Sequence, residues 1–196
     1  MSEVAAFVAW LGGAVIMLAD ARRGLAAGLV LVAVAAAGLT WAAGDLVGAL
    51  VLLAGGLIAA ALRYVIGPDG WGLMEPGSTP RLLFTVIAGL VTLWVAVAVT
   101  SGGSGGLRFG AIAILVLLTG RLLQGGPPAA LLTATSGLAL ALGIISGPLE
   151  PGGGVAFYVV AALVTAGVSA MPLASPARPT RPKTPAPPKS SRPSGT

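Results

Sequence analysis

The chain has 196 residues, of which 56% are hydrophobic and only 9% are charged, with a net charge of +5. A soluble domain is about 45–50% apolar and about 25% charged, because charge must cover its surface. This composition excludes an ordinary soluble domain and indicates an integral membrane protein.

Neither Cys nor His occurs in the chain. Their absence excludes disulfides, thiolate catalysis, Cys or His metal ligands and imidazole acid–base chemistry, so we expect no cofactor and no metal. Ala, Gly, Val, Leu, Arg and Pro are abundant, whereas Lys occurs only at Lys183 and Lys189. Such usage is typical of GC-rich bacterial genomes and favours the bacterial inner membrane as the location.

Seven apolar runs follow one another along the chain. A bilayer core about 30 Å thick needs about 20 apolar residues in a helix, and each run comes close to that length. None has an ionised residue near its middle, and all are continuously apolar, which favours helices over barrel strands. We therefore predict an all-α bundle of seven transmembrane helices within residues 1–174. The runs are 4–19, 24–43, 46–66, 82–100, 107–124, 128–146 and 155–171.

The first run lacks the basic residues that precede the core of a signal peptide. Arg22 and Arg23 follow the run instead. Ala19-Asp20-Ala21 loosely resembles a cleavage site, but we interpret the run as a retained helix whose N-terminus lies outside.

Short links join most of the runs, so that sequential helices are expected to be antiparallel neighbours. Asp20 and Asp45 lie in two of the tightest links and suggest turn residues or helix caps. The Gly-rich links 101–106 and 147–154 are flexible turns by composition.

The longest link, 67–81, is the candidate partner-binding loop, through Trp71, Met74 and Arg81. Long loops in a tightly connected bundle often carry function. Its apolar residues 71–74 could also dip into the membrane interface, with Trp71 at headgroup depth. The alternative is a plain interfacial loop.

Arg63 and Arg121 lie about one turn inside the ends of their predicted helices. An intramembrane cation is a candidate functional group, and both arginines are candidate contacts for an anionic lipid or an acidic substrate, or for pairing with a carboxylate. The simpler alternative is that they are anchors that extend outward to the headgroups. Run 107–124 crosses fully only if its flanking arginines extend in this way.

Basic residues predict the orientation. With seven crossings and the N-terminus outside, ten of the eleven Lys and Arg residues lie on the cytoplasmic side and only Arg108 lies outside. Basic residues in short loops favour the cytoplasm, so this arrangement is preferred.

Small residues spaced four apart predict close helix packing at Gly24/Gly28, Gly44/Gly48 and Gly143/Gly147. Chance accounts for some of these spacings in a chain with 30 Gly residues. Thr133 and Ser136 place hydroxyls in the sixth run, where a structural role is favoured over a polar path.

Residues 175–196 differ in kind, with frequent Pro and no large apolar side chain. We predict a disordered cytoplasmic tail. Its basic residues are candidates for contact with an anionic lipid surface or a partner, and the alternative is a simple topology anchor. These residues are Arg178, Arg181, Lys183, Lys189 and Arg192.

No motif defines a reaction. The acids divide between the two predicted membrane surfaces, which disfavours catalysis. The favoured hypothesis is a non-catalytic structural or accessory subunit, or a scaffold, of a bacterial membrane complex. The alternative is a small transporter or lipid-handling protein, in which Gly12-Gly13 and Gly55-Gly56 mark helix breaks. The expected partners are the lipid bilayer, with anionic lipids and other membrane subunits as candidates, and no nucleic acid.

Overall fold

The computed structural model describes residues 2–67, 69–72, 79–99, 105–147 and 154–173. These residues form seven α-helices and contain no strand. The helices are α1 (Ser2–Leu18), α2 (Arg22–Ala42), α3 (Leu46–Val65), α4 (Thr79–Val99), α5 (Gly105–Gln124), α6 (Pro128–Ser146) and α7 (Val155–Ser169).

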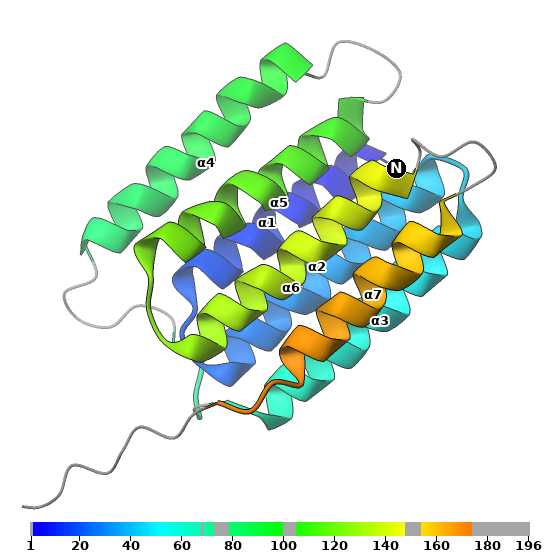
Figure 1. Ribbon diagram of the computed structural model, residues 1–196. Helices are drawn as coiled ribbons and strands as arrows, with labels where there is room; N and C mark the ends of the chain where they lie inside the picture. Colours follow the sequence, from blue (N-terminus) through cyan, green and yellow to red (C-terminus); the bar gives the residue numbers. More distant parts are fainter. Residues whose placement is uncertain (1, 68, 73–78, 100–104, 148–153, 174–196) are drawn as a thin grey trace, which may run out of the picture.

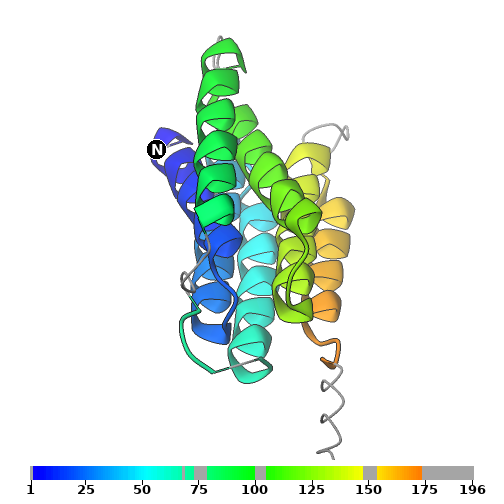
Figure 2. The same cartoon turned by 90° about the vertical axis from the view of Figure 1, so that its left-hand side faces the viewer.

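Six of the helices form two layers. Helices α1, α2 and α3 make one layer, and α5, α6 and α7 make the other, with α2 packed against helices of both (Figure 1). Helix α4 lies at the edge, beside α5 and α1 (Figures 1 and 2). The short links make successive helices antiparallel, as predicted.

Four helices are long and apolar enough to cross a membrane, namely α2, α3, α5 and α6. Helices α1 and α7 and the segment Leu82–Val95 of α4 are apolar but shorter. The predicted runs agree with the helices to within a few residues. An all-helical fold with four such helices indicates a membrane protein.

Glycine and alanine allow the layers to approach closely. A Cβ added at Gly48 or at Gly147 would collide with the ring of Tyr158, and one added at Gly55 would collide with Ala162. Gly28 lies against Ile16 in the same way. Close contact therefore exists at Gly28, Gly48 and Gly147, which are predicted packing positions, and the backbones gain van der Waals attraction there. It also exists at Gly55, which was predicted as part of a helix break.

Gly44 behaves differently from its predicted partner Gly48. It has a φ of 93° and no neighbour within 4 Å of an added Cβ. Its role is to make the left-handed turn between α2 and α3, a conformation that glycine adopts without steric cost.

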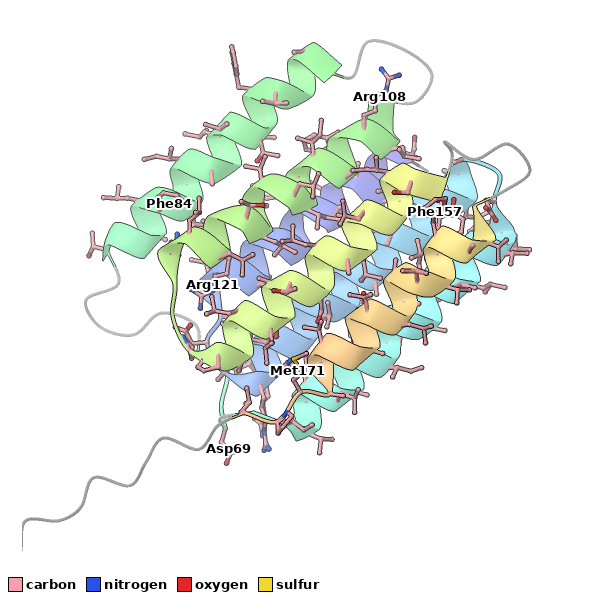
Figure 3. The ribbon with its side chains drawn as sticks, in the orientation of Figure 1. Asp69, Phe84, Arg108, Arg121, Phe157 and Met171 are labelled. Carbon is pink, nitrogen blue, oxygen red and sulfur yellow. The ribbon has the colours of Figure 1, made fainter. Side chains whose placement is uncertain are left out.

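The two ends of the bundle differ in charge, and Arg108 and Arg121 mark them. Figure 3 shows these two residues at opposite ends of α5. We name the ends after them. The Arg108 end holds the N-terminus of α1, and the Arg121 end holds the last turn of α7, so the described chain begins and ends at opposite ends (Figure 1).

Candidate functional site

The polar groups of greatest interest lie at the Arg121 end. Residues 69–72 fold back onto the α1–α2 turn there. The amide of Asp20 donates to the carbonyl of Gly72 over 3.1 Å, and the amide of Arg23 donates to that of Gly70 over 3.2 Å. Ala21, the N-cap residue of α2, has no side chain that can accept a hydrogen bond. The loop carbonyls therefore accept hydrogen bonds from amides that would otherwise lack an acceptor.

Arg121 is fully buried and ties the end of α5 to the α1–α2 turn. Its Nη2 forms an ion pair with Oδ1 of Asp20 and lies 3.5 Å from the carbonyl oxygen of Ala19. Its Nη1 donates to the carbonyl of Gly125 over 3.3 Å. Its acceptors lie in the α1–α2 turn and just after the last turn of α5, so the guanidinium is held at this end of the bundle. The anchor interpretation stays a prediction. The contact with an anionic lipid or substrate stays a prediction.

Arg63 is also fully buried, on the face of α3 that carries Ala59 and Ala60. None of its three guanidinium nitrogens has a hydrogen-bond partner within the described ranges. The anchor interpretation stays a prediction for this residue too. A buried charge is normally paired, since removing it from water is costly. Arg63 thus stands out as a cation that the described residues do not neutralise.

A groove runs along the outer face of α2 and α3 at the same end. We call it the α2–α3 groove, and its volume is about 700 Å³. Its mouth carries Arg23, Tyr64 and Trp71, with Tyr64 52% and Trp71 55% exposed. The remaining lining is Ala26, Ala27, Val30, Leu57, Ala60, Ala61 and Val65.

Arg22 lies beside this groove, but its guanidinium already contacts Asp69 and Tyr64. Its Nη2 forms an ion pair with Oδ1 of Asp69, and its Cζ lies 5.8 Å from the ring centroid of Tyr64. Asp69 projects from the same end of the molecule (Figure 3). The charge of Arg22 is therefore compensated locally, unlike that of Arg63.

A hydroxyl cluster joins α6 to α7. The Oγ atoms of Ser136 and Ser169 lie 2.9 Å apart, and Oγ1 of Thr165 donates to the carbonyl of Ser136 over 3.1 Å. Thr133 bonds back to the carbonyl of Ala129 over 2.7 Å. These bonds give the hydroxyls a structural role. The sequence offered one signal for the α7 members, because Thr165 and Ser169 are spaced four apart in an apolar run.

Two of the described acids, Asp20 and Asp45, lie in the turns between helices. Asp45 caps α3 by accepting the amide of Gly48 over 2.8 Å, which confirms the predicted cap. Asp20 lies in a turn, as predicted, and also pairs with Arg121. In the part of the chain that the structure covers, no three acids gather as a metal site would require.

Some of the predicted site residues lie within the described part of the chain, and others lie outside it. Trp71 lines the α2–α3 groove, one residue beyond the capping carbonyl of Gly70. Arg81 lies in the first turn of α4, but its side chain is outside the description, as are Met74 and the whole tail. The tail prediction concerns Arg178, Arg181, Lys183, Lys189 and Arg192 and lies entirely outside the described residues.

The fold and this basic end define a helical membrane protein with a partly neutralised cluster of arginines. Comparison with protein-family models, with curated proteins and with solved structures found no match.

Proposed function

We propose that the chain is a non-catalytic structural or accessory subunit, or a scaffold, of a bacterial membrane complex. In this proposal it crosses the inner membrane seven times, with the Arg108 end outside and the Arg121 end in the cytoplasm.

The main support for the proposal is the packing of two glycine pairs, Gly12-Gly13 and Gly55-Gly56. Helices α1 and α3 continue unbroken through Gly12-Gly13 and Gly55-Gly56. A Cβ added at Gly13 would meet Leu117, and one added at Gly56 would meet Ala33, so both pairs are filled contacts. Secondary transporters commonly place their sites at unwound helices near the midplane. These pairs instead serve helix packing, which favours a structural role.

The described charges support the orientation. Arg22, Arg23, Arg63 and Arg121 all lie at the Arg121 end, and Arg108 alone lies at the other. Basic residues near helix ends favour the cytoplasmic side. Because the helices are antiparallel, α1, α4 and α7 must then cross the membrane as well, although their apolar segments are shorter.

The edge position of α4 supports membership of a complex. This helix packs on α5 and α1, and the side chains turned away from them are apolar. Leu83, Leu90 and Trp94 are 58%, 59% and 77% exposed. Such an apolar face can pack against a neighbouring subunit in the bilayer, and lipid would cover it otherwise.

Purification of the tagged full chain from its native membrane in mild detergent tests the proposal. We expect a stoichiometric assembly that Trp94→Ala weakens. Leu163→Ala is the control, because this α7 residue is 66% exposed on another face of the bundle. A monodisperse single chain with no companion protein would contradict the proposal.

The second candidate is a small transporter or lipid-handling protein, and the buried Arg63 favours it. Arg63→Gln in the native host separates the two candidates. Loss of a transport phenotype with the assembly intact supports transport, whereas loss of the assembly supports the structural role. Arg121→Gln is unsuitable here, because it also breaks the pair with Asp20.

A further inference from the structure

We infer that the α2–α3 groove binds one anionic phospholipid, with its phosphate at Arg23 and an acyl chain along the alanine floor. This assignment goes beyond the proposed function and does not depend on it.

The shape of the groove suits an acyl chain. Its floor is built from alanines of both helices, whose small side chains leave an open channel between α2 and α3. From Arg23 at the mouth to Val30 the groove follows α2 for about 10 Å, at 1.5 Å per residue. The floor has no charged residue, so only an apolar chain fills it without losing hydrogen bonds.

The charge balance at this end favours an anion. The two described acids there, Asp20 and Asp69, pair with Arg121 and Arg22. Arg23 is exposed in the groove and forms no ion pair within the described ranges. Arg63 lies one turn along α3 from Ala60, which lines the groove, and it lacks a described partner. Arg23 is therefore the cation that a ligand in the groove can reach, while the buried Arg63 adds uncompensated positive charge at the same end.

The groups at the mouth match a phospholipid headgroup. Arginine binds phosphate oxygens through paired N–H donors. Tyr and Trp rings prefer the depth of the headgroups, with the apolar ring facing the lipid and the polar atom facing water. Polar groups thus gather at one end of the groove and apolar groups at the other, as in an amphiphilic ligand. A free phosphate ion would use only the mouth.

A second groove on the same face provides an internal contrast. It has a volume of about 650 Å³ and lies between α1, α2 and α3, with Val4, Trp41 and Leu46 among its lining residues. No charged residue lines it. It offers room for a chain without selecting a headgroup, so selectivity for an anion is expected only at the α2–α3 groove.

Native mass spectrometry of the purified full chain tests the inference. The protein is offered phosphatidylglycerol and phosphatidylcholine with the same acyl chains. We expect one phosphatidylglycerol to bind in preference. Arg23→Gln should reduce that preference about fivefold, the factor that one cation near an anionic headgroup contributes. Ala61→Trp should abolish the bound lipid, because the exposed Ala61 lines the groove and the indole fills it.

Matched variants distinguish the groove from general effects. Arg108→Gln removes an exposed cation at the other end, and Ala54→Trp adds an indole at an exposed α3 position outside the groove. Both should bind phosphatidylglycerol as the unaltered chain does. If Ala61→Trp fails to fold, Ala27→Leu narrows the same groove and should weaken binding.

Three results would overturn the inference. The first is equal binding of the two lipids, which removes the role of charge. The second is unchanged phosphatidylglycerol binding in folded Ala61→Trp, which places the lipid elsewhere. The third is full displacement of the lipid by inorganic phosphate, with phosphate also binding to Ala61→Trp, which identifies a free anion as the ligand.

Discussion

At the scale of single residues, the pair between Asp20 and Arg121 fixes how α1, α2 and α5 meet. The guanidinium of Arg121 is fully buried, whereas the Asp20 side chain is 25% exposed. Asp20→Asn removes the charge and leaves the cation buried, which should lower the free energy of unfolding by about 3 kcal/mol, near the low end for a broken buried pair. Unfolding in a detergent titration measures this. Equal stability of the variant and the unaltered chain would contradict the assigned pair.

The double replacement Asp20→Asn with Arg121→Met provides the control for that pair. It removes both charges together, so its cost should be smaller than the sum of the two single costs. Purely additive costs would show that the two residues act independently.

Arg63 leads to the opposite expectation. Its guanidinium is buried without a described partner, so Arg63→Met should raise the stability of the delipidated protein. Replacing even a complete buried ion pair by apolar residues can stabilise a protein by about 1–4 kcal/mol, and Arg63 lacks the compensating partner of such a pair. Arg23→Met, at an exposed position, should change stability little. A clear loss of stability in Arg63→Met would contradict this, and would mean that a group outside the described ranges pairs with it.

Residue contacts were also the hardest features to predict from the sequence. Asp20 and Arg121 were each singled out, one as a turn residue and the other as a candidate ligand contact. Their pairing joins positions 101 residues apart, and no local pattern encodes it. The Asp45 cap was predictable because it depends on residues only three positions away. Whether a contact could be predicted from the sequence depended more on the separation of its residues along the chain than on their types.

At the scale of helices, Tyr158 fills a pocket between two glycines. A Cβ at Gly48 or at Gly147 would overlap its ring, and the ring is fully buried. Gly48→Ala and Gly147→Ala should each destabilise the bundle by about 1–3 kcal/mol through overpacking. Thermal unfolding in detergent measures the effect. Combining Tyr158→Ala with Gly48→Ala should cost less than the sum of the two single costs, because the ring that the added Cβ overlaps is gone.

Gly167→Ala is the matched control on α7. An added Cβ there meets no atom within 4 Å, and the residue lies inside the helix. Because alanine favours a helix over glycine by up to about 1 kcal/mol, this variant should be neutral or more stable. Similar losses at Gly48 and at Gly167 would show that the close contact at Tyr158 has no energetic weight.

Helices were predictable because their signal is local. Continuous apolar runs of bilayer length, separated by Gly, Pro and Asp, place the helix ends to within a few residues. The groove between α2 and α3 was not predictable, since it depends on which faces of two helices meet. Its alanines are common residues in this chain and carry no signal of their own. From the sequence, Arg23 was predicted only to contribute to the orientation in the membrane.

For the whole molecule, the proposed function requires a bundle whose two ends face different compartments. The structure places the start of α1 and the end of α7 at opposite ends, and gathers the described arginines other than Arg108 at the Arg121 end. In the proposed orientation, that asymmetry turns the Arg121 end toward the cytoplasm, because basic residues near helix ends favour that side. An even number of crossings would instead bring both ends of the described chain to one side.

Cysteine labelling in intact cells is the most direct test of this claim, because the natural chain has no Cys to interfere. One cysteine replaces Ser2 at the start of α1, and another, in a separate variant, replaces Met171, which is 51% exposed just after α7. The account predicts that a membrane-impermeant maleimide labels the first in intact cells and labels the second only after the cells are opened. Labelling of the Met171→Cys variant in intact cells would contradict it.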